Sequence, residues 1–199
     1  MSHPQPLTAR LDRLRERLAS HRPWTDPEPE GEGLRWAAVA VILVPAPDAV
    51  LLIRRAERVG DPWSGHMALP GGRREPADDD LITTAIRETA EELGLTHSRD
   101  HLLGGLDDVV PRTPVLPPIA IRPHVFLVRE RPPLTLNPEV AGARWVELDR
   151  LLLPGTHHSV RLEIGGESRD VAAYQLDDAI VWGMTERVLS GLLAHLAPG

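Results

Sequence analysis

Residues 71–95, GGRREPADDDLITTAIRETAEELGL, decide the fold, because they join a glycine turn, an acidic segment and a helix. Ile82, Ile86 and Leu93 recur at helical spacing, and Gly94 stands where a helix commonly ends. One of the three aspartates at 78–80 can cap the N-terminus of this helix. The pattern therefore predicts a helix that follows the acidic segment and closes at Gly94.

Three glutamates of this helix, Glu88, Glu91 and Glu92, share one face because they stand at positions i, i+3 and i+4. Like charges at that spacing cost roughly 0.2–0.5 kcal/mol per pair. The chain contains no lysine, and Arg87 is the only cation in residues 86–95. A solvated acidic face is the ordinary alternative. The glycine turn and Arg87 instead favour a Mg²⁺ or Mn²⁺ site, because these cations prefer carboxylate oxygens and often bind together with phosphates.

The stretch resembles the Nudix box, a family pattern written G-x5-E-x7-R-E-U-x-E-E-x-G-U, in which U is a bulky apolar residue. Several pairs match the pattern in identity and spacing: Arg87-Glu88, Glu91-Glu92 and Gly94-Leu95, with Gly71-Gly72 at the front. Two departures stand out. Six residues rather than five separate Gly72 from Asp79, which stands where the pattern has Glu, and Thr89 occupies the first U position.

The resemblance implies an α+β fold, a Nudix-like α/β/α sandwich with a mixed β-sheet. It also implies that Glu88, Glu91 and Glu92 are metal ligands and catalytic residues, aided by a main-chain carbonyl of the turn at Gly71. Arg87 would brace the helix by pairing with a loop carboxylate such as Glu75. Nudix enzymes often supply a further carboxylate from a later loop, and Glu139 stands in that region. The residues leave open whether the general base is a box glutamate or Glu139, and whether Glu139 only caps or solvates a turn.

Composition excludes several classes of function. The chain has 199 residues and a net charge of -7, whereas binding to a nucleic acid or an anionic membrane requires a basic face. It has no cysteine, so it has neither a disulfide framework nor a thiolate site. No apolar run approaches the ~20 residues of a membrane span, and the N-terminus lacks the apolar core of a signal peptide. We expect a cytoplasmic protein with a small-molecule partner.

The chain divides into an N-terminal helical arm with a linker, residues 1–33, and a main domain, residues 34–199. The arm is predicted from an amphipathic stripe at helical spacing, made by Leu7, Leu11, Leu14 and Leu18. Residues 22–33 are rich in Pro, Gly and Glu, which is typical of a linker. The arm is expected to pack on the main domain or on a partner subunit, which would make a homodimer.

The rest of the main domain alternates strands with a few helices. The predicted elements, in order, are strands at 34–44 and 49–56, a loop at 57–67, strands at 101–110 and 119–130, a strand with a short helix at 143–152, a hairpin at 159–176 and a closing helix at 178–196. Gly165-Gly166 is the expected turn of the hairpin. These elements suit a layered domain with a mixed sheet.

A second resemblance, to coenzyme A pyrophosphatases, concerns the region upstream of the box. The matching residues are Leu51, Leu52, Arg55, Ala56, Gly65 and Pro70-Gly71-Gly72. The chain departs from this pattern at Ile53, Gly60 and Leu69, and its loop is one residue longer. The segment from Trp182 to Thr185 also resembles the C-terminal helix of these enzymes. The resemblance makes coenzyme A the favoured substrate.

The main hypothesis is a Mg²⁺-dependent pyrophosphohydrolase that cleaves a nucleoside diphosphate derivative by attack of water on phosphorus. Arg55, Arg58 and Arg112 are candidates to bind phosphate, because a guanidinium group recognises phosphate through two parallel hydrogen bonds. Hydrolysis of ADP-ribose or of another nucleoside diphosphate sugar is the first alternative. The second is a nucleotide-sensing module without turnover, since one fold can host both. Such modules usually lack box glutamates, and all three are present here.

Overall fold

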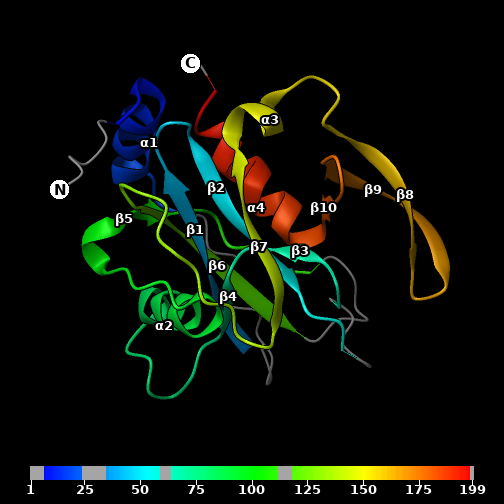
Figure 1. The fold of residues 1–199 in the computed structure, drawn as a ribbon, viewed down its shortest axis with the longest axis horizontal. Coiled ribbons are helices and arrows are strands. Elements are labelled where there is room, and N and C mark those ends of the chain that lie inside the picture. Colours follow the sequence, from blue (N-terminus) through cyan, green and yellow to red (C-terminus); the bar gives the residue numbers. More distant parts are fainter. Residues whose placement is uncertain (1–6, 24–34, 59–63, 112–117, 198–199) are drawn as a thin grey trace.

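The computed structural model describes residues 7–23, 35–58, 64–111 and 118–197. Helices lie on both faces of a central sheet, as Figure 1 shows. In chain order the elements are α1 (Ala9–Ser20), β1 (Arg35–Val44), β2 (Ala49–Arg55), β3 (Met67–Ala68), β4 (Gly71–Arg73), α2 (Leu81–Leu93), the 3-10 helix η1 (Arg99–His101), β5 (Leu102–Gly105), β6 (Ile119–Leu127), β7 (Val140–Glu147), α3 (Leu148–Leu152), β8 (His157–Ile164), β9 (Glu167–Gln175), β10 (Ile180–Trp182) and α4 (Gly183–Ala194).

The central sheet is mixed, as the sequence predicts. Its strands follow the order β3-β2-β1-β6-β5, with β4 paired to β1 and β7 paired to β2. Strands β1 and β6 run parallel from the pair Arg35 and Ile119 to the pair Leu43 and Leu127, whereas the other pairings of the sheet are antiparallel. A second sheet, β10-β9-β8, carries the hairpin β8-β9 away from the body of the molecule (Figure 1).

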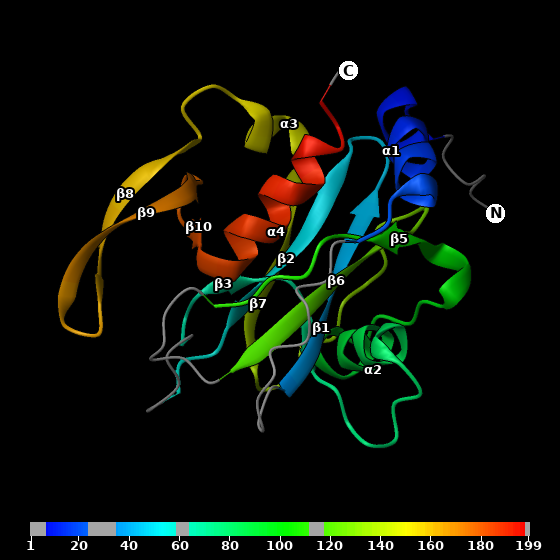
Figure 2. The same cartoon turned by 180° about the vertical axis from the view of Figure 1, so that it is seen from behind.

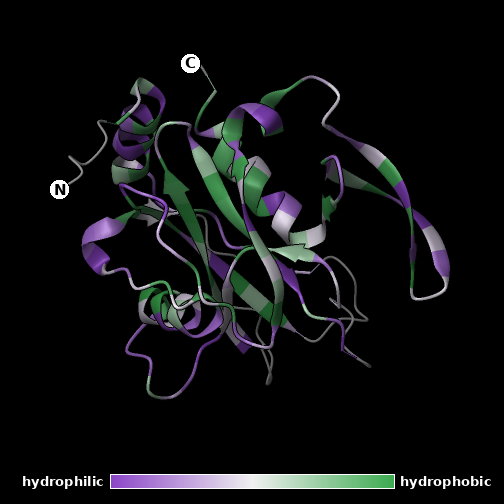
Figure 3. Ribbon diagram, viewed as in Figure 1, coloured by the Kyte–Doolittle hydropathy of each residue, from purple (hydrophilic) through white to green (hydrophobic). Residues whose placement is uncertain are grey.

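Two apolar cores make this a sandwich. Val41 and Leu43 of β1 pack on the face covered by α1 and α4, whereas Ile42 packs on the opposite face, which α2 covers. Figure 2 shows the same layers from behind, and Figure 3 shows the apolar residues concentrated on the central strands. Strands buried on both faces read as continuous hydrophobic runs, which explains the sequence of β1. The predicted α+β fold with α/β/α layers is confirmed.

Helix α2 has the boundaries that its capping residues dictate. Asp80 is the N-cap, and its carboxylate accepts a hydrogen bond from the Thr83 N–H at 2.8 Å. Gly94 closes the helix in the left-handed conformation at φ 61°. Of the three aspartates that could cap this helix, the last one does so.

Helix α1 packs on the main domain, one of the two positions expected for the arm. Leu11 and Leu14 are fully buried and Leu18 is 3% exposed, and all three join the core cluster that contains Val41. The helix lies against β5, where a Cβ added at Gly104 would come within 3.0 Å of the Leu18 carbonyl oxygen. Most of the expected linker lies outside the described residues.

The C-terminal part confirms the hairpin and corrects the closing helix. Gly165 and Gly166 form the turn between β8 and β9. The helix predicted from residue 178 begins only at Gly183, because Val181 pairs with Tyr174 in strand β10. Val181 is therefore buried as a strand residue and does not belong to the helical stripe.

Another predicted strand is shorter than expected. The strand expected at 101–110 ends at Gly105, and Val109 forms only an isolated bridge with Ile121. Within the described ranges, no helix combines the length and the apolar composition that a membrane span requires.

Candidate active site

Two of the box glutamates lie directly against the glycine turn. Glu92 is 4% exposed, and its Oε2 accepts a hydrogen bond from the Gly71 N–H at 3.0 Å. A Cβ at Gly72 would lie 2.3 Å from Oε1 of Glu88, and one at Gly71 would lie 2.3 Å from the Ala38 carbonyl oxygen. Gly71 therefore requires glycine, because a side chain there would collide with the backbone of β1, whereas a side chain at Gly72 would displace the Glu88 carboxylate.

Burial leaves these carboxylates in surroundings that disfavour their charge. Desolvation raises the pKa of Glu92 to about 7, against the opposing effects of the Gly71 N–H and of Arg55. Desolvation also raises the pKa of Glu88, against the effect of Arg87. A bound cation would favour the charged form of both groups. Strong pKa shifts of this kind are typical of functional sites.

Arg87 braces the site mainly through Asp78. The sequence had suggested a loop carboxylate such as Glu75 for this role. Its Nε and Nη2 donate to the two carboxylate oxygens of Asp78, each at 3.0 Å, while Glu75 Oε1 lies 3.9 Å from Nη1. The guanidinium group lowers the pKa of the buried Asp78 to about 2. Asp79, aligned with the box glutamate by counting from Arg87, is exposed. Counting five residues forward from Gly72 would have found Asp78.

Glu91 faces outward beside Arg87. The Nη1 atom of Arg87 lies 3.0 Å from Glu88 and 3.2 Å from Glu91, so a guanidinium group lies between these two carboxylates. No cluster of three or more acidic or histidine side chains in the described residues has the arrangement of a metal centre. The donor types nevertheless suit a hard divalent cation, because Glu88, Glu91 and Glu92 offer only carboxylate oxygens.

Glu139 comes to the same place from the loop before β7. The Asn137 N–H donates to the Glu92 carbonyl oxygen at 3.0 Å, and the Ala56 N–H donates to the Glu139 carbonyl oxygen at 2.8 Å. These bonds tie the loop to the end of α2 and to the end of β2. The charge of Glu139 is close enough to raise the pKa of Glu92.

The arginines that the sequence suggested for phosphate binding divide into two groups. Arg55 lies close enough to Glu92 to lower the pKa of that carboxyl, and Nη2 of Arg58 forms an ion pair with Glu139 at 2.9 Å. The structure thus brings both next to the carboxylates. Arg112 lies outside the described residues.

A histidine and a tryptophan meet beside these arginines, although they are distant in sequence. The rings of His66 and Trp182 contact edge to face, with centroids 4.8 Å apart. The Arg55 N–H donates to the His66 carbonyl oxygen at 3.0 Å, which places the pair beside the end of β2. The loop and the C-terminal segment, singled out separately in the sequence, thus belong to one surface.

Comparison with known proteins agrees with this geometry. The family model of the NUDIX domain matches residues 33–164 of the sequence, so the chain belongs to the Nudix family. The chain is 31% identical over 165 residues to the uncharacterised Nudix hydrolase NudL of Yersinia pestis, a match that covers 82% of this chain and 80% of NudL. Nudix hydrolases act on phosphoanhydride bonds, and the chain is an enzyme of this class.

Other relatives extend the comparison. An uncharacterised protein of Schizosaccharomyces pombe is 40% identical over 119 residues, which are 57% of this chain and only 36% of that protein. A MutT/nudix family protein of Enterococcus faecalis has a TM-score of 0.57 at 21% identity, over 83% of this chain and 63% of the other. The NUDIX domain of Shewanella oneidensis NrtR, complexed with ADP ribose, has a TM-score of 0.51 at 22% identity, over 69% of this chain and 84% of the other. Both structures share the fold.

Proposed function

We propose that the protein is a Mg²⁺- or Mn²⁺-dependent pyrophosphohydrolase that cleaves the diphosphate of coenzyme A or of a related nucleoside diphosphate derivative. The observation that carries this proposal is the convergence of three segments on one buried carboxylate. Glu92 lies beneath the glycine turn, beside the charges of Arg55 and Glu139. A site built from desolvated carboxylates and neighbouring guanidinium groups suits an anionic substrate bound together with a cation.

Glu88, Glu91 and Glu92 would hold the metal, with a main-chain oxygen of the turn at Gly71. A divalent cation held there would neutralise diphosphate charge and would lower the pKa of the attacking water. The support for this assignment is chemical, because the donors are carboxylates and burial raises the pKa of both Glu88 and Glu92.

The protein groups then have separate roles. Arg87, fixed by Asp78, holds Glu88 and Glu91 in position. Arg55 binds phosphate oxygens through its two parallel N–H donors. In the reaction, water attacks one phosphorus, the bridging P–O bond breaks, and the leaving phosphate keeps the bridging oxygen. Either Glu139 or a box glutamate accepts the proton of the attacking water.

Coenzyme A is the preferred substrate within this class. The upstream segment around Arg55 and the segment that begins at Trp182 both resemble coenzyme A pyrophosphatases, and the contact between His66 and Trp182 supports a shared role for the two segments. Coenzyme A also carries a ribose 3′-phosphate that needs its own cation, which Arg55, Arg58 or Arg112 could supply. ADP-ribose is the second candidate, because a protein with the same fold is complexed with ADP ribose.

A substrate panel tests the proposal. Coenzyme A, 3′-dephospho-coenzyme A and ADP-ribose are each incubated with protein and Mg²⁺, and the products are separated by chromatography. Coenzyme A should give 3′,5′-ADP and 4′-phosphopantetheine. Its hydrolysis should be at least about tenfold faster than that of the dephospho form, because the dephospho form lacks the charge-assisted contact of the 3′-phosphate. Arg58→Ala should narrow that gap, whereas Arg161→Ala, in the distal hairpin, should not.

The same panel can contradict the substrate assignment. Equal rates on coenzyme A and its dephospho form, or cleavage of ADP-ribose alone, would overturn the coenzyme A proposal and leave the pyrophosphohydrolase assignment intact. Absence of turnover on every diphosphate would favour a nucleotide-sensing module.

A further inference from the structure

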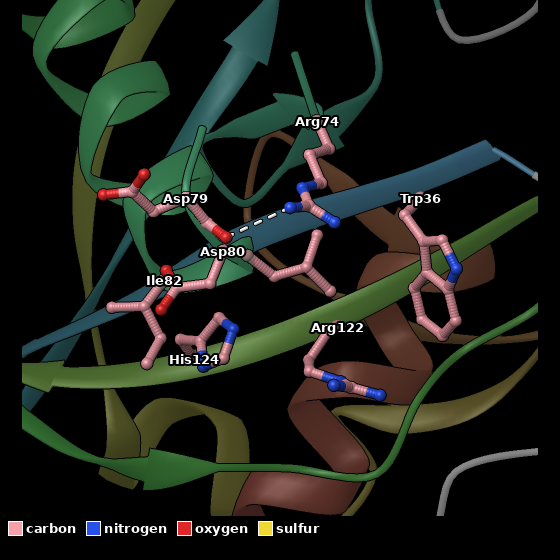
Figure 4. Close-up of a pocket in the computed structure, with 8 residues that line it drawn as sticks. Trp36, Arg74, Asp79, Asp80, Ile82, Arg122 and His124 are labelled. Carbon is pink, nitrogen blue, oxygen red and sulfur yellow. Dashed lines mark hydrogen bonds between the residues drawn. The ribbon is translucent and has the colours of Figure 1, made fainter. Parts of the chain in front are cut away.

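A cavity of about 380 Å³ lies at the N-terminal end of α2 (Figure 4). Its lining comes from β1, from the loop between β4 and α2, from the first turn of α2 and from β6. Asp80 caps the start of the helix, and Glu88 and Glu92 lie about 12 Å and about 18 Å further along its axis at 1.5 Å per residue. The cavity is therefore separate from the proposed diphosphate site.

His124 gives this cavity an unsatisfied polar group. The residue is 6% exposed, and its Nε2 is buried without a hydrogen-bond partner anywhere in the described ranges. The imidazole lines the cavity from β6 (Figure 4). Burial lowers the pKa of His124 to about 4, so the ring is neutral near pH 7 and offers either a donor or an acceptor. A buried group of this kind gains from a ligand that completes its hydrogen bond.

Trp36 and Arg122 form one firmly held wall of the cavity. The guanidinium carbon of Arg122 lies 5.1 Å from the centroid of the Trp36 ring. Arg122 is fixed in turn by two hydrogen bonds of 2.8 Å to the buried Asp108. Leu81 adds an apolar surface from the first turn of α2. The lining thus joins one aromatic ring and an aliphatic surface to fixed polar groups, and its volume falls in the range of 300–1,000 Å³ that is common for small-molecule sites.

The charges of the lining balance, which argues against a strongly charged ligand. Arg74 and Arg122 are opposed by Asp79 and Asp80. The Asp80 carboxylate already caps the helix N-terminus and pairs with Arg99 at 2.6 Å, so an anion would meet a carboxylate there. A cation would likewise meet the two arginines, whereas an uncharged ligand is repelled by neither set of charges.

We propose that this cavity binds an uncharged planar heterocycle of nucleobase size, which lies beside Trp36 and forms a hydrogen bond with Nε2 of His124. The site is independent of the diphosphate site, because it contains none of the residues proposed for catalysis or phosphate binding. Occupancy should therefore persist in a chain whose catalytic carboxylates have been altered.

Tryptophan NMR tests this inference with adenosine as the probe. The indole N–H signals of Trp36 and Trp182 are assigned through Trp36→Phe and Trp182→Phe and then followed during titration without metal. Trp36 lies in the cavity and Trp182 on the proposed substrate surface, so the two signals distinguish the sites. We expect the Trp36 signal to shift with a dissociation constant of the order of 0.1 mM, and to do so equally in Glu92→Gln.

Three variants make the test specific. Ile82→Trp, at a partly exposed position of the lining, should fill the cavity and weaken binding at least tenfold, and His124→Phe should do the same if it folds. Leu152→Trp, an equivalent enlargement at an exposed position on α3, should leave binding unchanged. Adenosine shifts confined to Trp182, undiminished binding by Ile82→Trp, or a stronger response of Trp36 to inorganic phosphate would each overturn the inference.

Discussion

Asp78 determines how α2 is held, although counting back from Arg87 along the box pattern leads to Asp79 instead. Its side chain accepts from Arg87, from the Thr84 hydroxyl at 2.9 Å and from the Glu75 N–H at 2.9 Å. One buried carboxylate thus fixes the acidic loop, the helix and the guanidinium group that lies between Glu88 and Glu91. Removing the charge of Asp78 takes away the carboxylate that binds this partly buried guanidinium group through two hydrogen bonds, which is destabilising.

We therefore expect Asp78→Asn to lower the free energy of unfolding by about 1–3 kcal/mol and to reduce turnover. The matched control is Asp79→Asn, an exposed neighbour, which should change the free energy of unfolding by less than about 0.5 kcal/mol. Urea denaturation measures both values. Equal effects of the two substitutions would show that Arg87 does not depend on Asp78.

At this scale the motif predicted that Glu88 and Glu92 lie beside the glycine turn, but it did not predict which carboxylate binds Arg87. The box spacing places Glu88, Glu91 and Glu92 on one face, but the chain has one extra residue between Asp78 and Arg87, and spacing alone could not locate it. Counting back from Arg87 consequently matched the glutamate position of the box to Asp79. The orphan nitrogen of His124 could not be predicted either, because it results from packing between β6 and α2.

Among the elements, α1 shows how a segment that reads as an arm can belong to the core. Leu11, Leu14 and Leu18 are buried in the same cluster as residues of β1 and β6. The amphipathic stripe predicted the buried face, whereas the surface that covers it is set by the tertiary fold. The late start of α4 has a similar cause, because Ile180–Trp182 is a short apolar run whose strand character depends on pairing with β9.

Leu14→Ala tests the position of this helix. It should lower the free energy of unfolding by about 2–4 kcal/mol, because it leaves a cavity in the core. Leu152→Ala, at a side chain that is 45% exposed, should have an effect below about 0.5 kcal/mol. Hydrolysis by the folded fraction of Leu14→Ala should remain near that of the wild type. Loss of activity with unchanged stability would instead place α1 in the active site.

At the scale of the whole molecule, two buried histidines make the free energy of unfolding depend on pH. Desolvation lowers the pKa of His97 and of His124 to about 4, from an ordinary value of 6.5. Between these values the unfolded chain binds protons that the folded chain does not. Stability should therefore fall as pH decreases from 6.5 to 4, and these histidines should have no effect on its pH dependence above that range.

Each such histidine contributes up to about 1.4 kcal/mol per pH unit within this window. We expect His124→Gln to reduce the slope of unfolding free energy against pH by about that amount, whereas the exposed His158→Gln should leave the slope unchanged. Glu92 acts in the opposite sense, because burial raises its pKa to about 7. The difference between variants is therefore the quantity to measure, by urea denaturation from pH 4 to 8. Identical slopes for the wild type and His124→Gln would contradict a neutral buried histidine.

We propose above all that the glutamates of α2 catalyse the metal-dependent hydrolysis of a phosphoanhydride bond. The most direct measurement is kcat on the fastest diphosphate substrate, with Mg²⁺ and after chelation, for Glu91→Gln, Glu92→Gln and the control Glu163→Gln in the distal strand β8. We predict no turnover after chelation, a loss of about 10²-fold or more in both α2 variants, and wild-type turnover in the control. Near wild-type turnover in Glu91→Gln and Glu92→Gln, with metal still required, would contradict the account.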